Sequence, residues 1–156
     1  MKTGYMVFDM MTNHPVTSNP EESVKDSAKI MKEKGVGSVL VIENGELVGI
    51  VTERDIVNSV VAENKNTQTI KLSEIMTLRE DMISIAPGKD IYDAMIIMKD
   101  NNVRRLPVID NGKLVGLLTL NDVLKIEPDL FDLYVEKLDI KEEERKFNIN
   151  NSGDDL

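Results

Sequence analysis

The chain has 156 residues, of which 41% are apolar and 30% are charged, a composition typical of a globular protein. It carries 28 acidic and 19 basic side chains, a net charge of −9, one histidine and no cysteine. These numbers exclude disulfides, thiolate metal ligands and a zinc site with several histidines, and the acidic surface disfavours nucleic-acid binding. We also expect no membrane segment and a cytoplasmic location, since neither a long apolar stretch nor a secretory signal occurs.

The first pattern along the chain is that of an amphipathic helix. Pro20 suits the first position of a helix, and Val24, Ala28 and Met31 then recur at helical spacing. Gly35 follows, and glycine often ends a helix because it adopts a left-handed backbone without strain. We therefore predict a helix from Pro20 to just before Gly35.

A β-hairpin and a second helix are predicted next. Apolar runs at residues 38–42 and 47–51 flank Asn44 and Gly45. Asn-Gly between two such runs is a strong hairpin signal, because a type I′ turn needs a positive φ at both central residues. The second run leads directly into a predicted helix over residues 53–62.

The second half of the chain repeats the first at an offset of 67 residues. When residues 16–57 are placed over residues 83–124, 15 of the 42 pairs are identical. The matches include Pro87 and the dipeptide Asn111-Gly112, so helix start and hairpin turn recur. Each unit therefore reads strand, helix, strand, strand, helix.

The segment after the repeats predicts a C-terminal amphipathic helix over residues 127–146. Leu130, Phe131, Tyr134 and Leu138 form one apolar stripe, which must be covered by the rest of the chain or by a second copy. Residues 147–156 are polar and acidic, and we expect them to be disordered.

The chain resembles the cystathionine-β-synthase-type (CBS) domain family over roughly residues 8–125. The resemblance is carried by two stretches at matching positions of the two repeats, Asn44–Asp55 and Val103–Asp122. The resemblance implies an α/β (α+β) fold with one repeat over residues 8–65 and another over residues 70–126. In this family such a pair, called a Bateman module, packs about a pseudo-twofold axis with two ligand clefts and often pairs into a homodimer.

The motif Thr-x-x-Asp stands where each repeat passes from strand to helix, as Thr52/Asp55 and Thr119/Asp122. One interpretation is a capping box, in which the threonine side chain accepts the backbone N–H of the aspartate and the aspartate side chain accepts the backbone N–H of the threonine. The other is a ligand site, since a carboxylate can accept hydrogen bonds from both hydroxyls of a ribose. The resemblance implies that role for the two aspartates, with the threonines beside them.

Adjacent arginines, Arg104 and Arg105, precede an apolar strand of the second repeat. They are interpreted either as a solvated strand end or as a phosphate clamp, which the resemblance favours, chiefly for Arg105. The first repeat has Gly37-Ser38 there and Arg54 as its nearest cation, so we expect unequal clefts. An arginine close to the pseudo-twofold axis can also reach a phosphate in the other cleft.

The resemblance also places the adenine end of a ligand near Thr17 and Ser84, for which capping and turn chemistry is the alternative. The complete set of expected ligand-binding residues is Thr17, Thr52, Arg54, Asp55, Ser84, Arg104, Arg105, Pro107, Thr119 and Asp122. No catalytic residue and no metal site are predicted.

The function that the resemblance implies is a regulatory module. Its ligand would be an adenine nucleotide (AMP, ADP or ATP) or S-adenosylmethionine, with no required cofactor, and its conformational change would be read by an unknown protein partner. A ligand-free structural dimerisation module remains an alternative, because capping alone explains Thr-x-x-Asp. An enzyme acting on nucleotides is less favoured, since the sequence shows no nucleophile–base pair.

Overall fold

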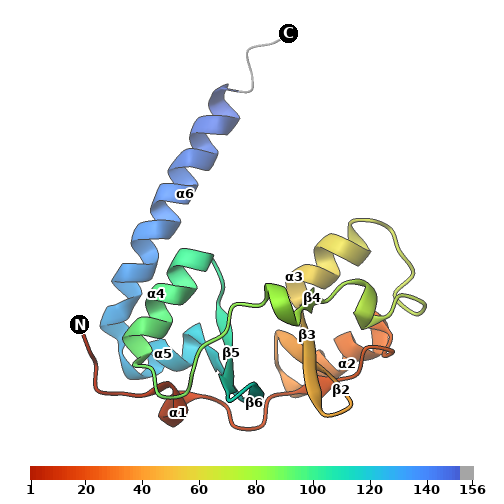
Figure 1. The fold of residues 1–156 in the computed structure, drawn as a ribbon. Coiled ribbons are helices and arrows are strands. Elements are labelled where there is room, and N and C mark those ends of the chain that lie inside the picture. Colours follow the sequence, from red (N-terminus) through yellow and green to blue (C-terminus); the bar gives the residue numbers. More distant parts are fainter. Residues whose placement is uncertain (152–156) are drawn as a thin grey trace.

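Two similar α/β units lie side by side, and a long helix projects away from the second unit (Figure 1). The computed structural model describes the backbone of residues 1–151 and the side chains of residues 1–135 and 142–147. Repeat one and the segment after it contain β1 (Thr17–Ser18), α2 (Val24–Lys34), β2 (Ser38–Glu43), β3 (Glu46–Thr52), α3 (Glu53–Ile56), the π-helix η1 (Val57–Val61), η2 (Leu72–Glu74), β4 (Thr77–Leu78) and η3 (Arg79–Asp81). Helix α1 (Val7–Met10) precedes repeat one. Repeat two and the tail contain α4 (Ile91–Asn101), β5 (Arg105–Asp110), β6 (Lys113–Thr119), α5 (Leu120–Ile126), η4 (Pro128–Leu130) and α6 (Phe131–Asn151).

Both predicted hairpins are confirmed. Asn44 and Gly45 have φ values of 51° and 81°, and Asn111 and Gly112 have values of 49° and 80°. These positive angles let β2 pair with β3, and β5 with β6, in antiparallel register. The first hairpin belongs to a four-stranded sheet of order β1-β2-β3-β4, and the second forms a two-stranded sheet.

The predicted helix start at Pro20 is wrong. Helix α2 begins at Val24, and the Ser23 hydroxyl caps it by accepting the N–H of Asp26. Helix α4 likewise begins after Asp90, whose side chain accepts the N–H of Tyr92. A polar side chain satisfies the otherwise unpaired N–H groups of the first turn, which proline cannot do. The two prolines instead lie in the turns that lead into these caps.

The first strand of repeat two is reduced to a single bridge, and Pro107 gives the reason. In repeat one the Leu40 N–H donates to the carbonyl of Val16 at 3.0 Å, which aligns β1 with β2. Pro107 stands at the position equivalent to Leu40 and has no N–H to offer Ile83, the counterpart of Val16. Only the bridge from Ile85 to β5 remains.

The N-terminal segment packs on repeat two, not on the repeat that it precedes in sequence. The Val7 N–H donates to the carbonyl of Lys89 at 2.8 Å, and Thr12 bridges to β6. Met11 lies against Gly116, where a Cβ atom would collide with the methionine sulfur. The glycine is therefore required by this close contact between segments far apart in sequence.

Asp90 anchors that N-terminal segment. Its carboxylate accepts the Thr3 hydroxyl at 2.8 Å, the N–H groups of Thr3 and Gly4 at 3.0 Å each, and the Tyr92 N–H at 2.8 Å. Burial alone would raise the pKa of Asp90. The hydrogen bonds from Tyr92, Thr3 and Gly4 together outweigh burial and lower this pKa to about 2.

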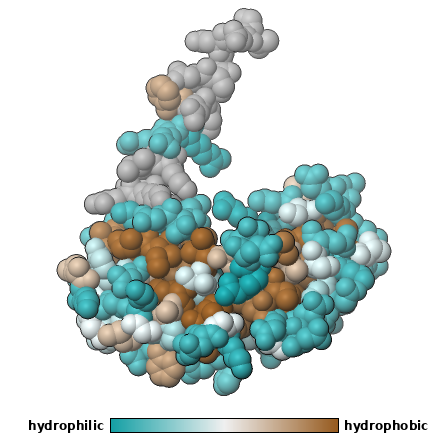
Figure 2. All heavy atoms as spheres, viewed as in Figure 1, coloured by the Kyte–Doolittle hydropathy of each residue, from teal (hydrophilic) through white to brown (hydrophobic). Residues whose placement is uncertain are grey.

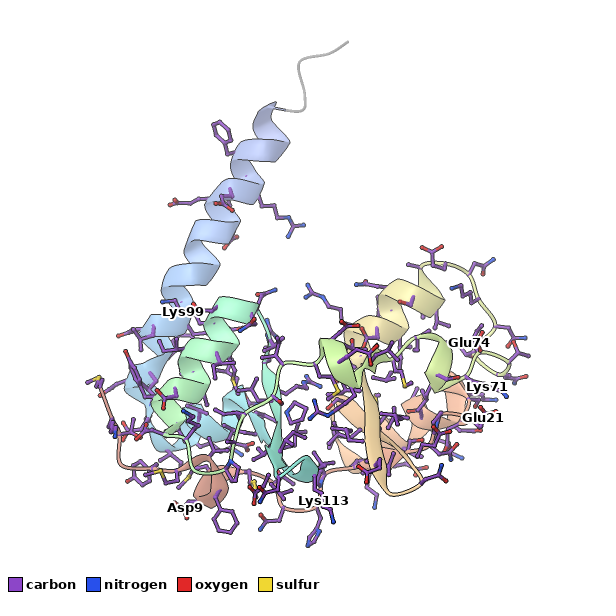
Figure 3. The ribbon with its side chains drawn as sticks, in the orientation of Figure 1. Asp9, Glu21, Lys71, Glu74, Lys99 and Lys113 are labelled. Carbon is purple, nitrogen blue, oxygen red and sulfur yellow. The ribbon has the colours of Figure 1, made fainter. Side chains whose placement is uncertain are left out.

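The segment between the repeats packs back on repeat one in the same manner. Strand β4 pairs with β3, and Met76 lies against Gly49 as Met11 lies against Gly116. Lys71 also makes an ion pair with Glu21, next to Glu74 (Figure 3). Each repeat is thus completed by the segment that precedes the other one.

The core is aliphatic and has three parts. One lies within each repeat, and a third joins them, with Leu40, Leu47 and Ile50 packed against Ile109 and Leu114. This third cluster holds the two sheets together at the junction between the repeats. None of the helices in the described part of the chain is long and apolar enough to cross a membrane.

The C-terminal helix docks on repeat two through part of the predicted stripe. Leu130 and Tyr134 are only 6% and 5% exposed and join the core of repeat two, with Leu133 packed beside them. Phe131 is 48% exposed, because it lies about one quarter of a helical turn away from that face. The Leu138 side chain lies outside the described residues. Helix α6 continues past the predicted boundary at 146 to Asn151, and residues 152–156 are not described.

Candidate functional site

Both Thr-x-x-Asp motifs form capping boxes. The Thr52 N–H donates to Oδ2 of Asp55 at 2.8 Å, the Asp55 N–H donates to the Thr52 hydroxyl at 3.3 Å, and that hydroxyl lies 3.1 Å from Oδ2. The corresponding distances for Thr119 and Asp122 are 2.9, 3.2 and 2.8 Å. The capping interpretation is therefore confirmed in both repeats.

The caps leave part of each carboxylate unused. An ionised carboxylate has about four acceptor positions. The threonine N–H and hydroxyl both engage Oδ2, and within the described residues no group donates to Oδ1 of Asp55 or of Asp122. Both side chains are partly exposed. Each aspartate can thus cap its helix and still accept hydrogen bonds from another molecule.

The Arg105 side chain, at the start of β5, reaches across the junction to repeat one. A Cβ atom added at Gly37 would lie 3.2 Å from both Nη1 and Nη2 of Arg105 and 2.6 Å from Oε1 of Glu53. The missing side chain at Gly37 therefore leaves the space in which an arginine of repeat two and a carboxylate of repeat one approach each other.

The charge of Arg105 is only partly compensated. Burial, the largest influence, lowers the pKa of Arg105 and Arg104 lowers it further, whereas Glu53 and Asp55 act in the opposite direction. Arginine nevertheless stays protonated in proteins. Among the residues whose side chains the structure describes, none forms a salt bridge with Arg105. A half-buried cation therefore faces the start of α3 without a direct ion partner.

A groove of about 480 Å³ opens beside this group, between α2 and the α3–η1 segment. Gly37 and Glu53 line one part of it, while Met31, Val36 and Val57 give it an apolar wall. Apolar side chains reach the surface over both halves of the molecule on the face shown in Figure 2. The groove thus combines an apolar wall with a charged end.

The other expected binding residues occupy more varied places. Thr17 is exposed in β1, and Ser84, its counterpart, is partly buried beside the bridge that Ile85 makes to β5. Pro107 is buried within β5, with its carbonyl accepting the Ile85 N–H at 3.1 Å. In the described part of the chain, no N–H donates to the carbonyl of Ile83, so that oxygen is an additional acceptor near Ser84.

Arg104 and Arg54 differ from Arg105. The Arg104 side chain is exposed, and its carbonyl accepts the Leu120 N–H at 2.8 Å, which positions the start of α5. The carbonyl of Gly37 does the same for Glu53 at 3.0 Å in repeat one. Arg54 is exposed in the first turn of α3. Of the three arginines, only Arg105 is brought into the junction between the repeats.

Sequence reasoning missed Glu53 as a member of the site. The one available signal was the contrast between repeats, since Glu53 corresponds to Leu120 and Gly37 to Arg104. Both differing positions of repeat one, Gly37 and Glu53, lie beside the Arg105 side chain. A comparison of the two repeats position by position could have identified these two positions, but only the fold shows that Arg105 lies next to them.

Comparison with known proteins gives a consistent result. The family model described as CBS domain matches twice, at residues 7–62 and 72–129. An uncharacterized protein of Methanopyrus kandleri is 37% identical over 134 residues, which cover 85% of this chain and 64% of that protein. The chain thus spans less than two thirds of this relative. The CBS domain-containing protein YhcV of Bacillus subtilis is 35% identical over 117 residues, covering 75% of this chain and 81% of YhcV.

A solved structure with the same fold contains ligands. It is a CBS domain pair in complex with 5′-methylthioadenosine and S-adenosyl-L-methionine, 28% identical to this chain, with a TM-score of 0.69. The likeness covers 78% of this chain and 94% of that one.

Proposed function

The chain belongs to the CBS-domain family, and from that premise we propose that it is a regulatory module that binds an adenosyl ligand in the clefts between its two repeats. The ligand class is an adenine nucleotide or S-adenosylmethionine, and the output is a conformational change that a protein partner reads. The observation that carries the proposal is the pair of capping aspartates that keep an unused carboxylate oxygen.

Ribose recognition is assigned to Asp55 and Asp122. Each Oδ1 atom is free of hydrogen bonds from the described residues and belongs to a side chain already held in place by its threonine. A carboxylate oriented in advance loses little entropy when it accepts the two hydroxyls of a ribose. The likeness to a CBS pair in complex with 5′-methylthioadenosine and S-adenosyl-L-methionine supports the ligand class.

Recognition of the rest of the ligand is assigned to the corner of Arg105 and Glu53. A guanidinium suits a phosphate, whereas the neighbouring carboxylate suits the cationic part of S-adenosylmethionine. The two side chains therefore favour different members of the ligand class. Repeat two has Leu120 instead of Glu53, so the two clefts are proposed to be unequal.

The test is a thermal-shift screen with AMP, ATP, adenosine and S-adenosylmethionine, followed by calorimetry. A ligand present at 100 times its Kd adds about 2.7 kcal/mol to the free energy of unfolding, or roughly 5–10 °C for a chain of this size. Asp122→Ala is expected to weaken binding by about 1.5–3 kcal/mol. Asp110→Ala, which removes an exposed acid at a hairpin, is the matched control and should bind normally.

Three results would contradict this proposal. If no adenosyl compound raises the melting temperature, the module is a structural unit with unoccupied clefts. If Asp122→Ala folds and binds as tightly as the parent, the aspartate is only a cap. Conversion of a nucleotide to a product during the incubation would support an enzyme instead.

A further inference from the structure

A methionine side chain fixes the segment between the repeats to repeat one. A Cβ atom added at Gly49 would lie 2.6 Å from Sδ of Met76 and 2.9 Å from its Cγ, distances that real Cβ atoms essentially never show. The Met76 sulfur thus fills the space that a side chain at position 49 would occupy. Strand β4 pairs with β3 directly after this contact, through Thr77 and Leu78.

The sulfur of Met76 is open to chemical attack in spite of this close contact. Met76 is partly exposed, whereas Met11, which holds the equivalent place over Gly116 in repeat two, is only 8% exposed. The chain has no cysteine, so its methionines are the sulfur groups that an oxidant meets. A thioether that solvent reaches is converted by peroxide to a polar sulfoxide.

A sulfoxide does not fit at this place. No space remains on the side of the Met76 sulfur that faces Gly49, and the side chain packs against the apolar core of repeat one, which includes Val51 and Leu72. A sulfoxide is far more polar than a thioether, and burying it without a hydrogen-bond donor costs free energy. Oxidation therefore drives the side chain away from Gly49.

The part of the chain that depends on Met76 begins at β4. Residues 66–74 are held on repeat one by other contacts, since Leu72 is fully buried and the carbonyls of Ile70 and Glu22 accept the N–H groups of Val24 and Leu72 at 2.9 and 3.0 Å. After Met76, β4 makes only two residue pairs with β3, and the chain then crosses to repeat two (Figure 1). Loss of the methionine contact thus loosens the connection between the repeats and leaves repeat one folded.

We propose that Met76 is a modification site, at which reversible sulfoxidation by hydrogen peroxide releases β4 and the crossing segment from repeat one. One oxygen atom of the peroxide forms a bond with the sulfur, the O–O bond breaks, and water leaves. The thioether loses two electrons and the peroxide gains them. A methionine sulfoxide reductase returns the sulfoxide to the thioether. This control of the joint between the repeats does not depend on a ligand in the clefts.

The experiment treats the full chain with increasing hydrogen peroxide and maps each sulfoxide by peptide mass spectrometry. Met1 and Met6, which are 91% and 40% exposed, should react first, Met76 next and Met11 last. In chains oxidised at Met76, hydrogen–deuterium exchange should show lost amide protection over residues 75–84 and unchanged protection over residues 66–73. The melting temperature should fall by at least about 3 °C. Treatment with methionine sulfoxide reductase should restore both properties.

Two matched variants assign the effect to one sulfur. Met76→Leu removes the reactive sulfur and keeps an apolar side chain of similar volume. Its melting temperature and the amide protection of β4 should stay unchanged in peroxide, although Met1 and Met6 are oxidised. Met11→Leu is the same change at the equivalent place in repeat two, and it should respond to peroxide like the parent. Circular dichroism confirms that each variant is folded.

Three results would overturn the proposal. Met76 could remain a thioether at peroxide concentrations that fully oxidise Met6. A chain oxidised at Met76 could keep the amide protection of residues 75–84. The Met76→Leu chain could lose this protection in peroxide as the parent does, which would assign the effect to another methionine, such as Met82 beside the cluster that joins the repeats. The cycle of oxidation and reduction on the parent needs no substitution, so the first two results can be obtained whether or not Met76→Leu folds.

Discussion

The position of Arg105 makes a quantitative prediction about ligand choice. Arg105→Ala removes a half-buried cation that has no salt-bridge partner among the described side chains. A charge-assisted hydrogen bond contributes about 1.5–3 kcal/mol, and the carboxylates of Glu53 and Asp55 already offset part of this charge. We therefore expect a loss of about 2 kcal/mol, or about 30-fold in Kd, for AMP or ATP. Adenosine has no phosphate and should be spared.

Calorimetric titration of parent and variant with AMP and with adenosine, at low and high salt, checks this expectation. Arg104→Ala is the matched control, because Arg104 is the adjacent arginine but is exposed, and it should change the Kd for AMP little. The difference between parent and Arg105→Ala should shrink at high salt, since screening weakens the phosphate contact in the parent. Equal losses for adenosine and AMP would refute the reasoning and indicate that Arg105 supports the fold. Unchanged binding of both would mean that it contacts no ligand.

Three further predictions concern the site and the fold. Glu53→Gln should tighten AMP binding and weaken S-adenosylmethionine binding, because it removes the negative charge beside Arg105; calorimetry that finds the same change for both ligands would contradict this. Ser27 is fully buried in α2, and its hydroxyl has no hydrogen-bond partner in the described structure. Ser27→Ala should therefore raise the free energy of unfolding by about 1–2 kcal/mol. Ala94 is the counterpart of Ser27 in α4, and Ala94→Ser should lower the free energy of unfolding by a similar amount. Chemical denaturation of both variants tests the pair, and no difference between them would refute it. Because the folded pKa of Asp90, about 2, lies below its ordinary 3.8, its stabilisation is present above about pH 4 and is lost as the pH falls towards 2. Asp90→Asn should therefore destabilise the chain by about 1–2 kcal/mol at pH 7 and flatten this acid limb, whereas an unchanged acid limb would contradict the assignment.

The sequence by itself determined the features that depend on neighbouring residues. Asn44-Gly45 and Asn111-Gly112 specify their turns because the required positive φ angles are a local property. Thr52/Asp55 and Thr119/Asp122 form caps for the same reason, since all partners lie within four residues. The 67-residue repeat then extended these local conclusions to both halves and identified the family.

Only the tertiary structure decided which distant segments meet. Helix α2 begins at Val24 instead of Pro20, and there the N–H groups of Val24 and Lys25 donate to the distant carbonyls of Ile70 and Thr67. That Arg105 reaches Gly37 and Glu53, and that the N-terminal segment packs on repeat two, follows from how the two sheets join. Such contacts leave no periodic signal in the sequence, because their partners are separated by tens of residues and meet only when the repeats pack together. The same is true of the helical faces, one covered by α6 and the other open.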